Sequence, residues 1–287
     1  MGKNVEKIIG VGRLGCAVAE EFSSYPEYRI YKILPESSER EDLSVGLHDN
    51  MEEYEKSVDF DEVGIYLRSV KTSDNVLLVV EGGDPISGIV LRTLEKVKDA
   101  KISVLYICPD RQMISETQRR DDKICYNILQ EYARSGVFKQ LMLARKPTIE
   151  ALIGDVPIDQ YEKTFSYFVS YAVAMMNYFT NTDTLLENQI NPADVCRIVT
   201  LALSSLDDSD SPLNSLFPLE EVRDLHFFYG IPTSDLSGDA SLLKKIKSHA
   251  RRHKTDKNVV SYSVHETSLE DVMVLCKAYS STIQKLG

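Results

Sequence analysis

Residues 76–88, with the sequence VLLVVEGGDPISG, join a short apolar run to a glycine-rich turn. The unbroken apolar run is typical of a strand that is buried on both faces of a parallel sheet. Gly82, Gly83 and Gly88 lie in the turn, and residues 86–98 then have the pattern of a helix. Glycine brings bare backbone N–H groups close to an anion, and the helix adds the positive end of its dipole. The stretch therefore predicts a phosphate-binding turn.

A second turn of this kind lies near the start of the chain, at residues 7–16 with the sequence KIIGVGRLGC. It follows an expected strand at 5–11 and precedes an expected helix at 14–22. One such turn is weak evidence, because short glycine patterns are common by chance. Two turns in the same layer suggest a nucleotide that is held from both sides of its phosphates.

The first half of the chain alternates between strand and helix patterns. Such alternation predicts an α/β fold with a doubly wound, mostly parallel sheet, and ligands at the carboxyl ends of its strands. We expect strands at 5–11, 28–34, 75–80, 102–108 and 138–144, and helices at 14–22, 86–98 and 122–135.

The second half begins with the longest helical pattern, at about 158–179, which is apolar on nearly every side and is therefore expected to be buried. The segments after it predict a smaller α+β domain. We expect helices at 195–206, 240–253 and 269–285, and strands at 225–229 and 259–264. The predicted domains are a Rossmann-like nucleotide-binding domain at 1–156, a central connecting helix at 157–180 and a C-terminal domain at 181–287.

Composition excludes several classes of protein. The net charge of −11 argues against direct nucleic-acid binding, and no apolar stretch is long enough to span a membrane. The five cysteines are scattered and lack the spacing of metal ligands, which favours reduced thiols in a cytoplasmic protein and no protein-held metal. The acidic region 35–61 and the basic helix 240–253 are expected to be solvated; docking of one against the other in a neighbouring copy is the alternative.

The order of these elements resembles the tubulin/FtsZ superfamily over most of the chain. In that family a first glycine loop, a second loop of the form GGGTG[ST]G, a long central helix and a smaller C-terminal domain follow one another. The second loop here matches that form at Gly82, Gly83, Ser87 and Gly88.

Later segments carry the same resemblance. Residues 115–117 and 126–129 look like the tubulin segments S-D-T and Y-N-x-x-L, and 225–228 resembles the first strand of the C-terminal domain. Residues 188–195 are similar to the family's catalytic loop, N-x-D-x-x-D/E, which precedes a helix. With this loop aligned on Asp194, the family's Asn and first Asp fall on Gln189 and Asn191.

The resemblance implies a protein that binds GTP or GDP, with Mg²⁺, and stacks head to tail into filaments. The catalytic loop of one subunit, with Gln189, Asn191 and Asp194, would complete the GTPase site of the next. The residues implied to bind the nucleotide are Gly10, Gly12, Arg13, Leu14, Gly15 and Cys16 of the first loop, Gly82, Gly83, Asp84, Ser87 and Gly88 of the second, Ser115 and Glu116 near the ribose, and Tyr161 near the base.

Three departures from the family pattern leave alternatives open. Asp84 places a negative charge beside the phosphates, Pro85 removes a backbone donor, and Asn191 lacks the charge of a carboxylate. Hydrolysis is therefore expected to be weak or lost. A silent structural homologue that assembles without nucleotide is the first alternative. An NAD(P)-dependent oxidoreductase, with Glu36 on the ribose, is the third choice.

Overall fold

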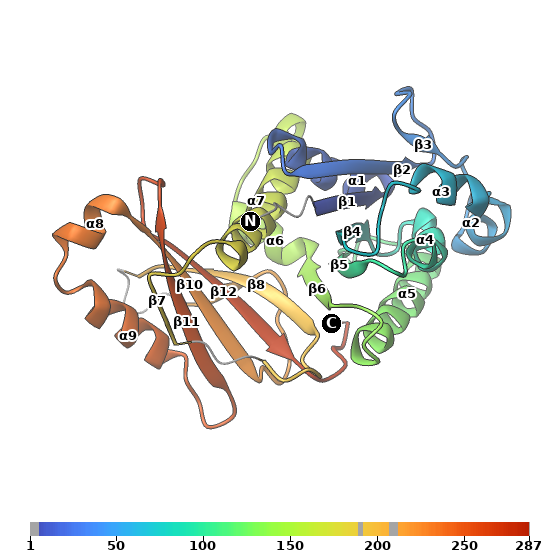
Figure 1. Cartoon of the computed structure of the whole chain (residues 1–287). Coiled ribbons are helices and arrows are strands. Elements are labelled where there is room, and N and C mark those ends of the chain that lie inside the picture. Colours follow the sequence, from blue (N-terminus) through green and yellow to red (C-terminus); the bar gives the residue numbers. More distant parts are fainter. Residues whose placement is uncertain (1–5, 189–191, 207–211, 287) are drawn as a thin grey trace. The chain divides into compact units, whose positions relative to one another are not determined.

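The computed structural model describes residues 6–188, 192–206 and 212–286. These residues form two compact units, one of residues 1–170 with 286–287 and one of residues 171–285. The division falls inside a long helix, α7 (Tyr161–Asn181). Each unit is described by itself below, and Figure 1 labels the elements of both.

The first unit contains a parallel sheet, as the alternating pattern predicts. Its strands lie in the order β3-β2-β1-β4-β5-β6, and every pair between them is parallel. The apolar run of β4 is buried along its length, which confirms a strand covered on both faces. The strands are β1 (Glu6–Val11), β2 (Tyr28–Leu34), β3 (Leu43–Ser44), β4 (Asn75–Glu81), β5 (Lys101–Cys108) and β6 (Gln140–Arg145).

Helices and short 3-10 turns connect these strands. The helix expected at 86–98 is in fact a 3-10 turn, η2 (Pro85–Ile89), followed by the short helix α4 (Val90–Lys96). The other connections are α1 (Gly12–Glu21), η1 (Phe22–Ser24), α2 (Met51–Ser57), α3 (Phe60–Tyr66), α5 (Glu116–Arg134), α6 (Lys146–Ile153) and η3 (Ile158–Gln160).

The long helix α7 confirms the central helix expected from the sequence. Its apolar side chains are buried on several sides, as the near-continuous apolar pattern indicated. The buried apolar residues are Phe165, Val169, Ala172, Val173, Ala174, Met176 and Phe179.

The second unit contains a mixed sheet in the order β8-β12-β10-β11-β7, with β9 paired to β8. The described pairs are antiparallel except β10 with β11, which run parallel. Helices α8 (Thr233–Gly238) and α9 (Leu242–Arg252) lie beside this sheet (Figure 1). The strands are β7 (Leu186–Asn188), β8 (Ile198–Ser204), β9 (Asn214–Ser215), β10 (Asp224–Pro232), β11 (Val259–Thr267) and β12 (Met273–Ser280).

Two of the helices predicted for this unit are strands in the structure. Residues 198–204 of the first, expected at 195–206, form β8, and residues 273–280 of the second, expected at 269–285, form β12. The two strands pair antiparallel with each other. A short apolar run does not distinguish a buried strand from a buried helix by its periodicity. Pairing with neighbouring strands decided the outcome here.

Candidate functional site

The two glycine loops lie side by side at the carboxyl edge of the first sheet. Val11 at the end of β1 is the register partner of Val80 in β4, so the turns after both strands leave the sheet together. A Cβ added to Gly12 would lie 2.8 Å from the Ile86 Cγ2 methyl and 3.0 Å from the Asp84 Oδ2 oxygen. Side chains of the second loop therefore contact the backbone of the first.

Most glycines of the two loops are required by close packing. A Cβ at Gly15 would lie 2.5 Å from the Val79 carbonyl oxygen, and one at Gly10 would lie 2.6 Å from the Gly15 carbonyl oxygen. A Cβ at Gly88 would collide with the backbone of Met51. In the first loop, these contacts allow α1 to pack tightly on β4.

Two other glycines have a conformation that favours glycine. Gly12 has φ 75° and Gly83 has φ 74°, both in the left-handed region. Gly12 lets the chain turn sharply directly after β1, and Gly83 does the same two residues after the end of β4. Backbone N–H groups at such turns are positioned to face an anion.

The helical segments that follow the two loops begin differently. α1 starts after Val11, which has no side chain able to cap its first turn. In the second loop, the Asp84 carboxylate caps η2 by accepting a hydrogen bond from the Ile86 N–H at 3.2 Å. Burial raises the pKa of Asp84. The first loop leaves its helix N-terminus without a side-chain anion, whereas the second loop supplies its own.

Side chains of the first loop are mostly committed to the core. Leu14 and Cys16 are buried, and the Cys16 thiol donates to the Gly10 carbonyl at 3.3 Å. Burial raises the pKa of Cys16 to about 12, so the thiol stays protonated at neutral pH. Only the backbone of these two residues is available to a ligand.

The Ser87 hydroxyl of the second loop differs from the side chains of the first loop, because it is buried without a hydrogen-bond partner among the described residues. Buried hydroxyl groups are ordinarily paired, because an unpaired one costs free energy. Ser87 is therefore a group that a ligand or a water would satisfy.

Ion pairs between neighbouring elements lie around the loops. Arg13 Nε lies 2.9 Å from Glu162 Oε2 at the start of α7, and Lys146 Nζ lies 3.0 Å from Glu81 Oε1 at the end of β4. Burial raises the pKa of Glu81, while Lys146 opposes that rise. Both cations are thus already paired with carboxylates, and Arg13 does not neutralise Asp84.

Tyr161 at the start of α7 is half-buried. Its hydroxyl donates a hydrogen bond to Glu150 Oε1 of α6. Burial, and after it this carboxylate, raises the pKa of the tyrosine above its ordinary value. The role of Tyr161 toward a base stays a prediction.

Ser115 is the N-cap of α5, and Glu116 is the first residue of that helix. Ser115 Oγ accepts from the Gln118 N–H at 3.2 Å, and the Ser115 N–H donates to Gln118 Oε1 at 3.0 Å. This reciprocal pattern is a capping box, readable from Gln118 three residues after Ser115. The Glu116 side chain is exposed.

Sequence reasoning missed several charged groups of this region. Asp122 is buried next to Gly82, and its Oδ1 accepts a hydrogen bond from the Tyr106 hydroxyl at 2.8 Å. Burial raises the pKa of Asp122. Glu81 and Lys146 were also missed. Glu81 is the last residue of β4, and Lys146 directly follows β6. Their position at the carboxyl ends of parallel strands is the signal that could have identified them.

The expected catalytic residues are only partly placed. Gln189 and Asn191 lie outside the described residues. Asp194 lies in the second unit with an exposed side chain, and its backbone carbonyl accepts a hydrogen bond from Arg197 Nε at 2.7 Å. The role of Asp194 therefore stays a prediction.

The two loops differ in how well they fit a phosphate. In the first loop, the uncapped start of α1 and the turn at Gly12 fit an anion. In the second loop, the unpaired Ser87 hydroxyl also fits an anion. Asp84 and Ile86 do not fit one, because a carboxylate and a methyl group contact the Gly12 turn. Within residues 6–188, 192–206 and 212–286, no group of three or more His, Cys, Asp or Glu side chains is arranged to hold a metal ion.

Comparison with known proteins rests on structure alone. No protein-family model matches the sequence, and no curated protein matches it. FtsZ from M. jannaschii superposes with a TM-score of 0.67 at 12% identity, over 96% of this chain and 87% of that chain.

Two further proteins superpose equally well. TubZ from Bacillus thuringiensis serovar israelensis, in GDP-form protofilaments, gives a TM-score of 0.70 at 13% identity, over 97% of this chain and 84% of that chain. CetZ2 from Haloferax volcanii, in a GTPγS-bound protofilament, gives 0.69 at 13% identity, over 97% and 94%. In the part of the chain that the structure describes, no helix is long and apolar enough to cross a membrane. The matches to FtsZ, TubZ and CetZ2 each cover 96% or more of this chain, and they show that it has the tubulin/FtsZ fold.

Proposed function

We propose that this chain is a tubulin/FtsZ-like filament protein whose copies stack head to tail. The observation that carries the proposal is the likeness in fold over 96% or more of the chain. The matched TubZ and CetZ2 structures are protofilaments, and TubZ is also described as two-stranded and four-stranded filaments. A head-to-tail contact that does not close into a ring produces a filament.

We also propose that a guanine nucleotide binds at the two glycine loops. The uncapped N-terminus of α1 and the Gly12 turn would hold its phosphates by backbone N–H groups, and Ser87 would gain a hydrogen-bond partner. A bound nucleotide supplies a phosphate chain whose charge these groups can stabilise. The Asp84 carboxylate would repel the phosphate charge. We therefore expect nucleotide binding to require Mg²⁺, and to be weaker than binding to a loop that has no carboxylate at this position.

A second candidate is assembly without nucleotide. It is favoured by the same carboxylate, because Asp84 accepts the Ile86 N–H that would otherwise face a phosphate. In this case Asp84 supplies the anion at the start of η2, beside the Gly12 turn. GTP hydrolysis in trans, with Asp194 as the acidic residue, is weak under the first candidate and lost under the second.

The experiment that separates these candidates is nucleotide binding combined with assembly. Purified full-length protein is mixed with GTP, GDP or NAD, with and without Mg²⁺, and followed by light scattering and sedimentation. Scattering that depends on GTP supports the nucleotide-binding filament. Assembly without any nucleotide supports the second candidate. Binding of NAD alone, without assembly, would contradict both.

Two substitutions make the test specific to the loops. Asp84→Asn removes the charge but keeps the shape of the side chain, and it should increase GTP binding if the phosphates lie beside residue 84. Asp99→Asn is the matched control, because Asp99 is an exposed carboxylate in a surface turn of the same unit. Equal effects of the two substitutions would show that only net charge matters.

A further inference from the structure

The outer edge of β2 is only partly covered by the rest of the chain. β3 has just two residues and pairs with Ile33 and Leu34 alone. On the other side, β2 pairs with β1 from Tyr28 to Ile33. Residues 28–32 therefore have no strand partner on their outer side within the described residues.

Backbone hydrogen bonds show which residues of β2 face outward. The Lys32 N–H donates to the Tyr66 hydroxyl at 3.0 Å, and the Lys32 carbonyl oxygen lies 3.2 Å from the same hydroxyl, whose single proton it shares with the Glu41 carbonyl oxygen. The Leu34 carbonyl accepts from the Val45 N–H at 3.0 Å. Since outward-facing residues alternate along a strand, Ile30 is the next one, and both of its backbone groups face outward.

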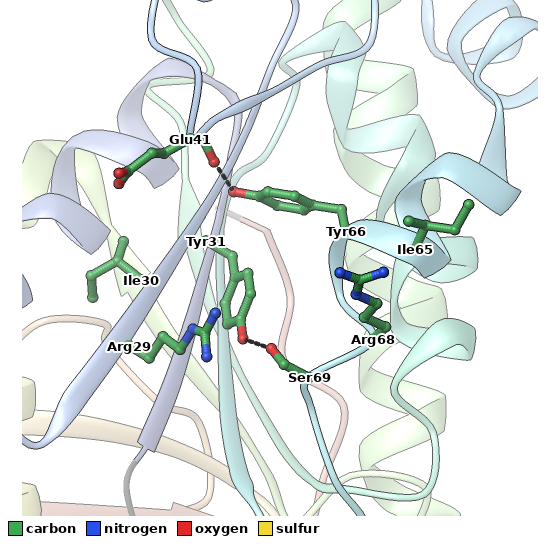
Figure 2. Close-up of a pocket in the computed structure, with 8 residues that line it drawn as sticks. All are labelled: Arg29, Ile30, Tyr31, Glu41, Ile65, Tyr66, Arg68 and Ser69. Carbon is green, nitrogen blue, oxygen red and sulfur yellow. Dashed lines mark hydrogen bonds between the residues drawn. The ribbon is translucent and has the colours of Figure 1, made fainter.

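Ile30 is one of the residues that line a groove beside α3. Figure 2 shows this groove in close-up. The groove has a volume of about 750 Å³. Its lining comes from β2, from Glu41 and from the segment 65–69. The Tyr31 hydroxyl is hydrogen-bonded to the Ser69 hydroxyl, and the Tyr66 hydroxyl donates to the Glu41 carbonyl at 3.0 Å, so both tyrosine rings are held in place.

The groove carries more positive than negative charge. Arg29 and Arg68 both line it with exposed side chains, and among the described residues neither has a carboxylate partner within ion-pair distance. Among the residues of the lining that the structure describes, Glu41 alone is acidic. The Arg29 guanidinium lies 5.5 Å from the centre of the Tyr31 ring. This contrasts with the chain as a whole, whose net charge is −11.

An apolar side chain completes the surface. Ile65 of α3 lines the groove and is 63% exposed. An unpaired strand edge, two cations and an apolar contact together suit an extended segment that alternates acidic and apolar residues, because successive side chains of a strand point to opposite faces.

We propose that the outer edge of β2 binds an extended acidic segment of a partner protein as an added strand, paired at Ile30 and flanked by Arg29 and Arg68. The same edge of a second copy of this chain fits less well, because it would bring a second Arg29 and a second Arg68 to the same place. The proposal does not depend on nucleotide binding or on filament assembly.

The test uses hydrogen–deuterium exchange on the full-length protein. The probe is an acetylated, amidated heptapeptide of alternating Glu and Val. In the free protein, the Ile30 amide should exchange much faster than the Lys32 amide, which is hydrogen-bonded. Saturating peptide should slow exchange at Ile30 at least tenfold. The same peptide with Lys in place of Glu should have no such effect.

Charge-reversal variants complete the test. Arg29→Glu combined with Arg68→Glu should abolish protection by the acidic peptide and produce protection by the lysine peptide. Lys123→Glu combined with Arg134→Glu, two exposed positions on α5, changes the net charge equally and should behave like the parent protein. Unchanged exchange at Ile30 with the acidic peptide, or equal effects of the two peptides, would overturn the proposal.

Discussion

The two glycine loops look alike in sequence but present different groups to the space between them. The first loop presents a bare glycine turn and a helix N-terminus with no side-chain cap. The second presents the Asp84 carboxylate, which already caps its own helical turn, and the Ile86 methyl group. Glycine spacing therefore reports how closely the backbone packs. The ligand chemistry of a loop depends on the side chains between its glycines.

The largest effect is expected from the packing glycines, which test the first half of this comparison. Gly15→Ala places a Cβ 2.5 Å from the Val79 carbonyl oxygen, a contact that only movement of α1 away from β4 can relieve. We expect a loss of about 2–4 kcal/mol in the free energy of unfolding. Urea denaturation followed by circular dichroism measures it.

The matched control for this substitution is Gly238→Ala. A Cβ at Gly238 would meet nothing within 4 Å, and the residue lies in α8 without a left-handed φ. Its free energy of unfolding should be unchanged or slightly higher. A Gly15→Ala protein as stable as this control would mean that the first loop is glycine-rich for its ligand and not for its packing.

The second prediction concerns the charge that separates the two loops. Asp84→Gly should raise the affinity for GTP about 10–100-fold, because it removes a carboxylate from beside the Gly12 turn and frees the Ile86 N–H. Isothermal titration calorimetry in the presence of Mg²⁺ measures the change. An affinity equal to that of the parent protein would place the phosphates elsewhere.

The pH dependence of binding gives this prediction a second readout. Burial raises the pKa of Asp84, so as the pH falls through that pKa the carboxyl becomes neutral in the folded protein. Repulsion of the phosphates then disappears, and the affinity of the parent protein should approach that of Asp84→Gly. The ratio of the two affinities is therefore expected to be largest at high pH and to shrink towards acid. A ratio that does not change with pH would contradict the assignment.

The third prediction tests the ion pair directly before the second loop. Lys146→Met leaves the half-buried Glu81 carboxylate without its cation, whose Nζ lies 3.0 Å away. We expect a loss of about 1–2 kcal/mol of stability at pH 8. Burial already raises the pKa of Glu81, and this substitution raises it further, so protonation at lower pH should relieve most of the loss. A loss of equal size at pH 5 and pH 8 would show that packing of the lysine stem, and not charge, is responsible.

The parallel sheet of the first unit could be predicted from the sequence because its strands are marked locally. The apolar run of β4 and its glycine turn fix a strand and its end within a few residues. In the second unit the same reasoning failed for β8 and β12. Each has an apolar pattern that suits either a helix or a strand, and pairing between segments about 75 residues apart decided between them.

The candidate site was predictable only in part, for a related reason. Glycines and their spacing are visible in the sequence, so both loops and their common edge could be expected. The Asp84 cap on Ile86 and the pairs of Arg13 with Glu162 and Lys146 with Glu81 depend on side-chain positions. No spacing rule reveals that Arg13 and Lys146 are already paired.

The smallest effect is expected at the N-terminus of α5, beside the second loop. A Cβ at Gly83 would lie 3.4 Å from the Gln118 carbonyl oxygen, so the capping box of Ser115 and Gln118 packs close to that loop. Ser115→Ala removes the Oγ that accepts the Gln118 N–H and should cost about 1 kcal/mol of stability. Ser115→Asp keeps a capping oxygen and should restore most of that stability. If the hydroxyl serves only as the capping acceptor, neither variant should change GTP affinity by more than about twofold, within the spread of non-contacting surface changes. A clear loss of affinity in Ser115→Ala at nearly unchanged stability would instead establish the ribose contact that the resemblance implies, and would make this serine part of the site and not only of the helix.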